Sequence, residues 1–461
     1  MKKIGFVSLG CPKNLVDSEV MMGLVKKHGY QLTADQHEAE IVVINTCAFI
    51  DPAKEESIDT ILEMAQLKKT GRCQKLVVAG CLVERYRDVL VNEMPEIDAV
   101  LGTNQVEDIL KVCEPGSQPE PGRRPLQRPT HRGAETAPAS SQAMEYLYDH
   151  TTPRVLSTPR YTAYIKIAEG CDHTCDFCII PQLRGKMRSR RMESVVQEAR
   201  DLADQGVREV VLVGQDTTHY GEDLGRRHGL AQLLRQLARV DGLRWVRFLY
   251  GYPYHVTDEL LDVVASEGKL CKYFDIPFQH ASQRILQRMR RGGSRATLER
   301  LVERIRQRMP QAAVRTSFIV GYPGETEEDF QELLNHVRQE QFNHVGVFTY
   351  SDEERTAAFN HPDKVPERTA RARRRTLMKE QARISRRKNS DLVGHRVEVL
   401  LEGVSNESEF LWQGRIESQA PEIDGCVLIN EAPEDRALEP GQFVTVEITR
   451  AFDHDLLGRV V

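Results

Sequence analysis

The sequence has no long apolar run. No stretch of its 461 residues approaches the roughly 20 consecutive apolar residues that a helix needs to cross a bilayer. The start, residues 1–9, carries two lysines and several apolar residues, but the apolar run ends at Gly10 and no cleavage site follows. We therefore expect a first β-strand there rather than a signal peptide, and a cytoplasmic protein with no membrane partner.

The chain also has little net charge. The formal value is −5, so the overall balance does not indicate a nucleic-acid partner. Residues 364–388 nevertheless carry eleven Lys/Arg against two Glu, and residues 388–461 carry six Lys/Arg against fifteen Asp/Glu. We expect the basic stretch to be a solvated connecting helix rather than a nucleic-acid contact. The acidic segment fits a basic protein better than a phosphate backbone.

The length suggests about three domains. Residues 1–113 alternate strand and helix patterns, which predicts a doubly wound α/β domain. Residues 114–159 are rich in Pro, Gly, Arg, Ser and Ala, which is typical of a linker. Residues 160–387 contain about six β/α units, which predicts a partial (β/α)6 barrel. Residues 388–461 predict a small antiparallel β-barrel.

Cysteine is not scarce, and three of the ten cysteines form one short motif. Cys171, Cys175 and Cys178 have the spacing Cys-x3-Cys-x2-Cys. Three thiolates on one loop can hold an iron–sulfur cluster and leave one iron open to a ligand. A zinc site usually takes four ligands in paired blocks, and His173 lies between the first two cysteines, a poor position for a fourth. We expect a cluster; a zinc knuckle or core thiols are the alternative.

Three other cysteines share a different context, because each directly follows an expected strand of the first domain. They are Cys11, Cys47 and Cys81, after residues 3–9, 41–45 and 76–79. Ligands of doubly wound sheets bind at the carboxyl ends of the strands, so three thiols placed there are expected to meet. This predicts a second three-thiolate cluster; the alternative is buried thiols acting as small hydrophobes. The four other cysteines have no partner at metal spacing and are expected to be structural: Cys73, Cys113, Cys271 and Cys426.

Apart from the linker, the chain resembles the radical S-adenosylmethionine (SAM) methylthiotransferases. It shares an amino-terminal three-cysteine domain, a Cys-x3-Cys-x2-Cys barrel and a carboxy-terminal barrel of the TRAM type. The resemblance implies two [4Fe–4S] clusters, with SAM both as radical source and as methyl donor. It implies catalytic roles for two sets of metal-binding cysteines: Cys171, Cys175 and Cys178 for SAM cleavage, and Cys11, Cys47 and Cys81 for the auxiliary cluster that supplies sulfur.

Several runs resemble the branch of this family that modifies a ribosomal protein rather than tRNA. They are residues 8–19 (SLGCPKNLVDSE), 51–58 (DPAKEESI), 178–181 (CIIP), 214–217 (GQDT) and 275–282 (DIPFQHAS). Members that act on tRNA have Gln-Met-Asn-like residues where this chain has Pro12-Lys13-Asn14. The implied reaction is methylthiolation of the β-carbon of an aspartate in small-subunit ribosomal protein twelve, met free or on the ribosome. The implied partners also include a sulfur donor and a flavodoxin or ferredoxin as electron donor.

Two other functions stay open on the residues alone. The basic helix supports the same chemistry on a modified adenosine of tRNA. A non-enzymatic iron–sulfur adaptor that binds RNA is the alternative from another class. Residues expected to contact SAM lie beside the cluster loop or at strand ends: Phe177, Ile179, Gln215, Gly324 and Glu325. For Glu325, the alternative is a role in capping the helix that follows.

The chain departs from the family pattern at two places. Arg355 stands where a glycine is expected, so the turn around it is expected to differ. Ala48 follows Cys47 where glycine is common, and we expect little consequence from that change.

Overall fold

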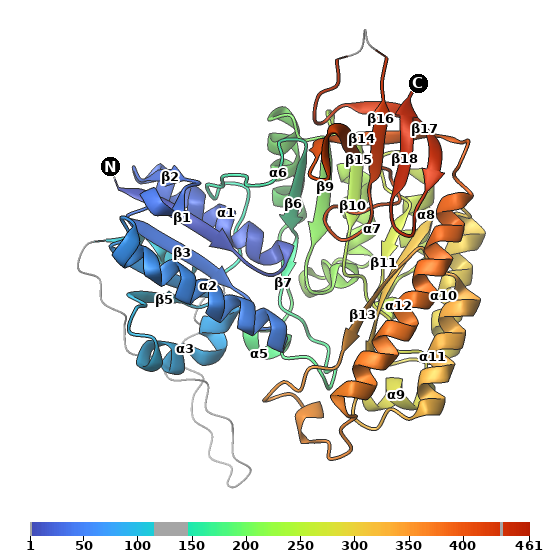
Figure 1. Cartoon of the computed structure of the whole chain (residues 1–461), viewed down its shortest axis with the longest axis horizontal. Helices are drawn as coiled ribbons and strands as arrows, with labels where there is room; N and C mark the ends of the chain where they lie inside the picture. Colours follow the sequence, from blue (N-terminus) through green and yellow to red (C-terminus); the bar gives the residue numbers. More distant parts are fainter. Residues whose placement is uncertain (1, 115–145, 434–436) are drawn as a thin grey trace. The chain divides into compact units, whose positions relative to one another are not determined.

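The computed structural model describes residues 2–114, 146–433 and 437–461 (Figure 1). It forms two compact units, which we call the first unit (Met1–Ser157 with Ile180–Lys186) and the second unit (Thr158–Ile179 with Met187–Val461). Most of the expected linker, residues 115–145, lies outside the described residues. Within the described part of the chain, no helix has the length and apolar character needed to cross a membrane.

The first unit contains a parallel sheet of five strands in the order β2-β1-β3-β4-β5. The strands are β1 (Lys3–Ser8), β2 (Gln31–Thr33), β3 (Ile41–Thr46), β4 (Lys75–Gly80) and β5 (Ala99–Leu101). The helices are α1 (Pro12–Lys27), α2 (Asp51–Thr70), α3 (Cys81–Glu93), α4 (Ile109–Cys113) and α5 (Ile180–Arg184). This strand order is one of the common doubly wound orders, and its switch point lies between β1 and β3. The predicted fold of this domain is confirmed.

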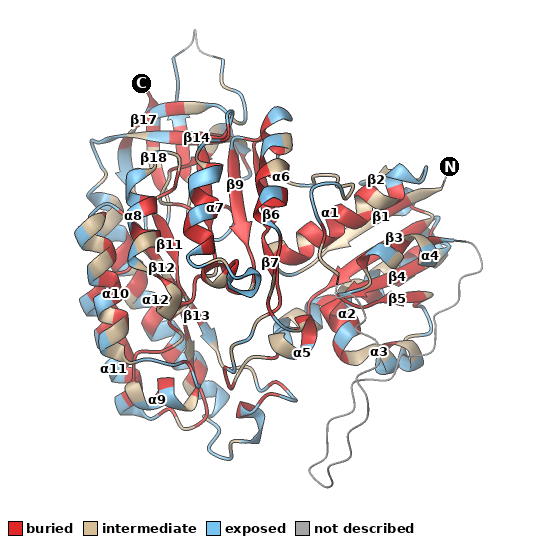
Figure 2. Cartoon of the chain, turned by 180° about the vertical axis from the view of Figure 1, so that it is seen from behind, coloured by how far each residue is buried: buried red, intermediate tan, exposed pale blue. Residues whose placement is uncertain are grey.

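The second unit begins with a partial barrel of parallel strands. They are β6 (Thr162–Lys166), β9 (Glu209–Val213), β10 (Trp245–Phe248), β11 (Tyr273–Asp275), β12 (Ala313–Val320) and β13 (His344–Thr349). They pair as β10-β9-β6 and β11-β12-β13. The Gly251 amide donates to the Asp275 carbonyl at 2.8 Å, which joins the two groups after β10 and β11. Every residue of β6, β9, β10 and β11 is buried, as expected for a parallel sheet covered by helices, whereas β12 and β13 also carry residues that are not buried (Figure 2).

Helices and two short strands connect the barrel strands. The helices are α6 (Met192–Asp204), α7 (Gly229–Leu237), α8 (Asp258–Ser266), α9 (Gln283–Arg288), α10 (Arg295–Arg308), α11 (Glu327–Glu340) and α12 (Glu367–Ser390). The short strands β7 (Ala168–Glu169) and β8 (Arg188–Ser189) pair with each other. The basic helix α12 is not solvated all round, because Ala370, Leu377 and Ile384 on one side of it are buried.

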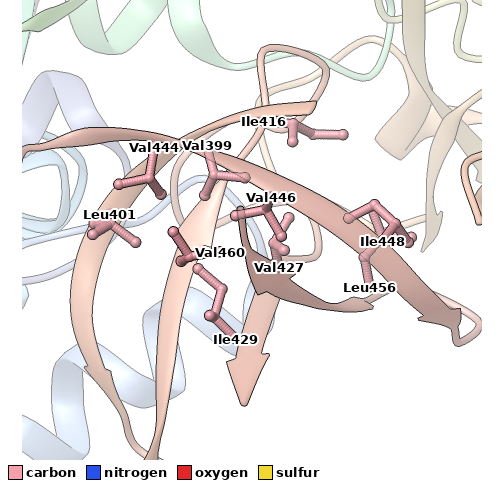
Figure 3. Close-up of a cluster of buried hydrophobic side chains, with 10 residues drawn as sticks. All are labelled: Val399, Leu401, Ile416, Val427, Ile429, Val444, Val446, Ile448, Leu456 and Val460. Carbon is pink, nitrogen blue, oxygen red and sulfur yellow. The ribbon is translucent and has the colours of Figure 1, made fainter. Parts of the chain in front are cut away.

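The chain closes with a five-stranded barrel in the order β14-β15-β16-β18-β17. The strands are β14 (Arg396–Ser405), β15 (Ser408–Arg415), β16 (Val427–Glu431), β17 (Phe443–Ala451) and β18 (Leu456–Val460). Ten aliphatic side chains fill its interior, among them Val399, Val446 and Leu456 (Figure 3). The pairing is antiparallel except between β16 and β18, which run parallel.

Buried charges join this small barrel to the bottom of the β/α barrel. The Glu209 carboxylate, at the start of β9, has no solvent exposure and accepts from Arg415 at 2.6 Å and from Arg247 at 3.2 Å. Arg247 also donates to the Glu417 carbonyl at 2.8 Å. Two arginines hold the pKa of Glu209 below its usual value even though burial acts to raise it. A buried carboxylate needs such partners, so the two barrels share one polar core.

Candidate active site: two groups of three cysteines

The first group lies at the carboxyl ends of β1, β3 and β4, which are adjacent in the sheet. Cys11 precedes α1, Cys47 directly follows β3, and Cys81 is the first residue of α3. A Cβ atom built on Gly10 would stand 3.0 Å from the Cys47 Sγ, so the loop after β1 touches the cysteine after β3. Gly10 has a φ of +84°, which glycine adopts readily. The distant cysteines therefore share one edge of the sheet.

Asparagine side chains fix this edge. The Asn14 amide nitrogen donates to the Leu9 carbonyl at 3.2 Å and to the Thr46 carbonyl at 2.8 Å. The Asn45 amide nitrogen donates to the Asn14 carbonyl at 2.8 Å. Both asparagines are buried. The hydrogen bonds tie the end of β1 to the end of β3, so the relative positions of Cys11 and Cys47 depend on contacts between distant parts of the sequence.

The thiols of this group influence one another. Burial, followed by the charges of Cys81 and Cys11, raises the pKa of Cys47 to about 12. Burial also acts to raise the pKa of Cys11, but the positive charges of Lys13 and Arg184 outweigh it and lower that pKa. Three thiolates placed this close repel each other unless cations are present.

The second group lies on the loop after β7. Cys175 is buried, and Cys171 and Cys178 are partly exposed. The Arg291 guanidinium approaches the Cys175 Sγ to 3.5 Å and donates to the Pro277 carbonyl at 2.7 Å. Burial first, and then Asp216 and Cys175, raise the pKa of Cys171 to about 11.

His173 does not turn toward these cysteines. Its Nε2 lies 2.7 Å from Asp216 Oδ2, and its ring stacks on Tyr252 with centroids 3.8 Å apart. His255 Nδ1 contacts the same Asp216 oxygen at 3.0 Å. Burial acts to raise the Asp216 pKa, but its hydrogen bonds to both histidines hold that pKa well below its usual value. His173 thus anchors the cysteine loop to the end of β9.

Neither group of three cysteines brings its sulfurs as close together as a single ion requires. Zinc–sulfur bonds of about 2.3 Å keep the sulfurs of a tetrahedral site within about 4 Å of one another. Within the described residues, only two sets of side chains lie close enough for one ion, and neither contains a cysteine. They are His173 with Asp216 and His255, and Glu299 with His336 and Glu340. The more widely spaced thiols can instead hold the separate irons of a cluster.

Three of the residues expected to contact SAM lie near the cysteine loop. Ile179 is buried, and Phe177 packs against the hydrophobic cluster formed by Ile285, Met289, Tyr322 and Ala358. Gln215 follows β9, and its amide nitrogen donates to Glu169 at 2.5 Å. A role in binding SAM stays a prediction for these residues.

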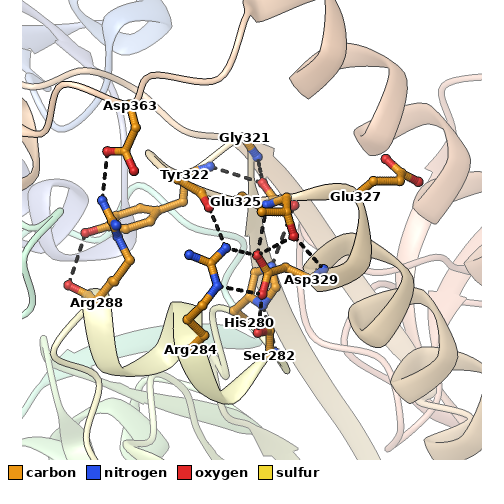
Figure 4. A network of polar contacts seen from close by, with 12 residues as sticks. His280, Ser282, Arg284, Arg288, Gly321, Tyr322, Glu325, Glu327, Asp329 and Asp363 are labelled. Carbon is orange, nitrogen blue, oxygen red and sulfur yellow. Dashed lines mark hydrogen bonds and ion pairs between the residues drawn. The ribbon is translucent and has the colours of Figure 1, made fainter.

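Gly324 and Glu325 lie in the turn between β12 and α11, and Figure 4 shows Glu325 there. The Glu325 carboxylate accepts from the backbone amides of Gly321 and Tyr322, and its second oxygen is 3.7 Å from His280 Nε2. Gly324 has a φ of +81°. The carboxylate thus shapes the turn, and a contact of either residue with SAM stays a prediction.

The expected alternative role of Glu325, capping the next helix, belongs to other residues. Thr326 and Asp329 form a reciprocal capping box at the start of α11. Asp329 also accepts from Ser282 at 2.6 Å and pairs with Arg284 (Figure 4). The alternative considered for Glu325 therefore does not hold, because Thr326 supplies the hydroxyl that caps α11.

The departure at Arg355 does not change the backbone in the expected way. Arg355 has a φ of +69°, in the left-handed region that favours glycine. The turn therefore keeps a glycine-like conformation with an arginine in it.

Among the four cysteines predicted to be structural, burial raises the pKa of Cys113, Cys271 and Cys426 to about 12, which keeps them as thiols.

Comparison with known proteins supports this division of the chain. Residues 3–102 match an uncharacterised protein family, UPF0004; residues 165–337 match the radical SAM superfamily; residues 393–461 match the TRAM domain. Ribosomal protein uS12 methylthiotransferase RimO from Koribacter versatilis is 51% identical, with 100% of this chain and 96% of that protein aligned. RimO from Solibacter usitatus is 53% identical over 100% and 95%. The chain belongs to the RimO family.

Solved structures agree with the fold of this RimO-family chain. The radical SAM methyltransferase TsrM from Kitasatospora setae, with tryptophan substrate and a SAM analogue bound, has a TM-score of 0.52 and 18% identity. The match covers 75% of this chain and 73% of TsrM. At this identity the likeness concerns the fold alone.

Sequence reasoning missed two arginines that this RimO-family chain places next to its cysteines. Arg291 lies beside Cys175, and Arg184 donates to the Cys81 Sγ at 3.4 Å. The order of the residues along the chain holds no spacing signal for either contact, because each arginine is more than a hundred residues from its cysteine.

Proposed function

We propose that this protein is a radical-SAM methylthiotransferase that acts on the β-carbon of an aspartate in ribosomal protein uS12. The observation that carries the proposal is identity of about 50% over the whole chain to proteins named uS12 methylthiotransferase RimO. The two cysteine groups supply what such a reaction requires at two separate places. The product would be 3-methylthioaspartate.

Each cysteine group has a distinct proposed role. Cys171, Cys175 and Cys178 would hold the [4Fe–4S] cluster at which SAM is cleaved, while Cys11, Cys47 and Cys81 would hold the auxiliary [4Fe–4S] cluster. With SAM bound, the first cluster would supply the radical that takes a hydrogen atom from the substrate; the auxiliary cluster would supply the sulfur, and SAM the methyl group, that replace it. Three protein thiolates leave one iron of each cluster open.

The protein side chains hold these sites in place. Asp216 anchors the SAM-cluster loop through His173, and Arg291 places a positive charge beside Cys175. Asn14 fixes the strand ends that carry Cys11 and Cys47. Of the three cysteines of the SAM-cluster loop, Cys175 is the one that is shielded from water, while Cys171 and Cys178 stay partly exposed.

The partners follow from this chemistry. The substrate is a ribosomal protein, so we propose a cytoplasmic site of action, and the acidic segment 388–461 complements a basic protein. A flavodoxin or ferredoxin would supply low-potential electrons, and a separate donor would restore the sulfur.

The test uses anaerobically reconstituted, reduced protein with SAM and sulfide. Purified uS12 and bulk tRNA are offered in separate reactions, and the products are weighed by mass spectrometry. We expect replacement of one hydrogen by SCH3 on a single aspartate-containing peptide of uS12, and formation of 5′-deoxyadenosine.

Other outcomes would contradict the proposal at different levels. The same mass gain on a tRNA nucleoside alone would transfer the chemistry to tRNA. With both clusters verified, the absence of 5′-deoxyadenosine in either reaction would leave a non-enzymatic iron–sulfur protein as the better description.

A further inference from the structure

A buried arginine lies beside the auxiliary cysteines. Arg184 ends α5, the short helix that begins two residues after Cys178, yet residues 180–186 pack with the first unit. Its guanidinium is only 3% exposed. Its Nη2 donates to the Cys81 Sγ at 3.4 Å and also to the Asn14 side-chain oxygen. The cation therefore contacts both a cysteine ligand and the asparagine that fixes the strand ends.

A carboxylate balances this cation on its other side. Arg184 Nη1 donates to Asp17 Oδ2 at 2.9 Å, and Asp17 is buried as well. Asn14 and Asp17 are one turn apart on α1, directly after Cys11. The planar guanidinium reaches both residues and the sulfur at once, a geometry that the single ammonium group of lysine does not reproduce.

We propose that Arg184 is a positioning residue that sets the reduction potential of the auxiliary cluster through its positive charge beside Cys81. The Asp17 carboxylate would partly offset that charge. The inference rests on the proposed cluster at Cys11, Cys47 and Cys81. It adds a function for a residue outside the cysteine motifs.

The direction of the effect follows from electrostatics. Reduction of a cluster adds one negative charge. A buried cation and an N–H···S hydrogen bond stabilise that charge, so both raise the reduction potential. The Asp17 carboxylate offsets part of the cation's effect. Removal of Arg184 should therefore lower the potential, and neutralisation of Asp17 should raise it.

The experiment isolates the auxiliary cluster in the full chain. Replacing Cys171, Cys175 and Cys178 by Ala removes the other cluster site. In this background, Arg184→Met, Arg184→Lys and Asp17→Asn are compared with the unaltered parent. Iron and sulfide content report loading, and a redox titration followed by electron paramagnetic resonance reports the potential.

We expect opposite shifts. Arg184→Met should raise the ratio of oxidised to reduced cluster at a fixed potential by about tenfold, which corresponds to about 59 mV for a one-electron couple. Asp17→Asn should shift the ratio in the other direction. The reduction potential of Arg184→Lys should lie between those of Arg184→Met and the parent, because lysine keeps the positive charge but lacks the planar guanidinium group.

The matched control is Arg154→Met. Arg154 pairs with Glu19, another buried carboxylate of α1, so this change also removes from the first unit an arginine whose side chain is only 8% exposed. We expect no more than a small change in potential. An equal shift in this control, or shifts of the same sign in Arg184→Met and Asp17→Asn, would overturn the proposal.

The outcomes separate this inference from the function on which it rests. If the background variant holds no cluster, the auxiliary site itself is wrong and the inference falls with it. If it holds a cluster whose potential is the same in all variants, only the role of Arg184 is wrong. If Arg184→Met protein binds no cluster, the directions of the potential shifts in Arg184→Lys and Asp17→Asn decide whether Arg184 has the proposed role.

Discussion

The two cysteine groups reach a similar arrangement by different routes. One draws its thiols from a single loop of eight residues, which His173 fastens to Asp216. The other draws them from three strand ends that Asn14 and Asn45 join through hydrogen bonds to the backbone. In the first case the spacing along the chain defines the site, and in the second the sheet defines it.

The groups are alike in one respect that their sequences do not share. An arginine lies within hydrogen-bonding reach of one sulfur in each, Arg184 at Cys81 and Arg291 at Cys175. Three thiolates concentrate negative charge in a buried place, and a buried charge needs a partner. Both cysteine groups therefore obtain a positive charge from an arginine that lies far away in the sequence.

The largest expected difference between the sites is chemical. Cys175→Ala should reduce formation of 5′-deoxyadenosine to the background of the assay, because the proposed SAM cluster would lose one of its three thiolate ligands. Cys47→Ala should leave SAM cleavage measurable and abolish sulfur insertion. Liquid chromatography of 5′-deoxyadenosine and mass spectrometry of uS12 distinguish the two losses. Methylthio product from Cys47→Ala protein would show that the two sites are assigned wrongly.

A second change should disrupt the site that the sheet defines. Asn14→Ala leaves the buried Thr46 carbonyl and the partly buried Leu9 carbonyl without their side-chain donor. We expect about 2–4 kcal/mol less free energy of unfolding in the first unit, since each unsatisfied buried group costs about 1–3 kcal/mol. Urea denaturation of cluster-free protein measures the loss. Asn104→Ala, an exposed position in the same unit, should change stability by less than about 0.5 kcal/mol; equal losses would refute the role of Asn14.

The third prediction uses pH to distinguish the charged contacts between Asp216 and the histidines from the uncharged hydrogen bonds of Asn14. The hydrogen bond that His255 donates to the Asp216 carboxylate raises the pKa of His255, so the folded state favours the charged histidine. That stabilisation is complete below the ordinary histidine pKa of about 6.5 and is lost as pH rises through the raised value. The Asp216 pKa is lowered, so its own contribution is lost only in strong acid.

Asp216→Asn should therefore cost most stability near pH 5.5, by about 1–2 kcal/mol after allowance for the partly exposed histidines. The cost should shrink at pH 8.5. Urea denaturation of cluster-free protein at both pH values tests this expectation. The cost of Asn14→Ala should be the same at both, because an amide does not titrate; a cost of Asp216→Asn that does not vary with pH would argue against the charged anchor.

The smallest expected effect concerns a turn outside both sites. A left-handed conformation costs a residue other than glycine about 1–2 kcal/mol, and glycine loses about 0.5–1 kcal/mol more in conformational entropy on folding. Arg355→Gly should therefore raise the free energy of unfolding by up to about 1 kcal/mol. Arg355→Ala removes the same side chain but keeps the Cβ, so thermal denaturation should find it no more stable than the parent.

Much of the fold was predictable because the strands are short, apolar and regularly spaced. Residues 41–45 and 209–213 are recognisable as strands from their valine and isoleucine content alone. The strand β18 (Leu456–Val460) is not recognisable in this way, because five residues at the end of an acidic segment carry little pattern of their own. That strand closes the small barrel and introduces its one parallel pair.

The candidate site was predictable to the extent that sequence spacing determines it. Cysteines that follow parallel strands are placed by topology, so their common edge could be inferred. Arg184 and Arg291 could not be found in this way, since their contacts depend on how distant segments pack. The role of Glu325 was obscured because two acidic residues, Glu325 and Asp329, flank the start of α11, and only the structure shows which one caps it.

The carboxylate of Glu209 has a consequence for the evolution of this chain. Its partners Arg247 and Arg415 come from different barrels, and none of the three side chains is more than 3% exposed. A shortened chain that ended after α12 would uncover Glu209 and Arg247 together. The small barrel is therefore not a detachable module, and exchange of this segment between relatives should succeed only where the donor brings an arginine at the position of Arg415.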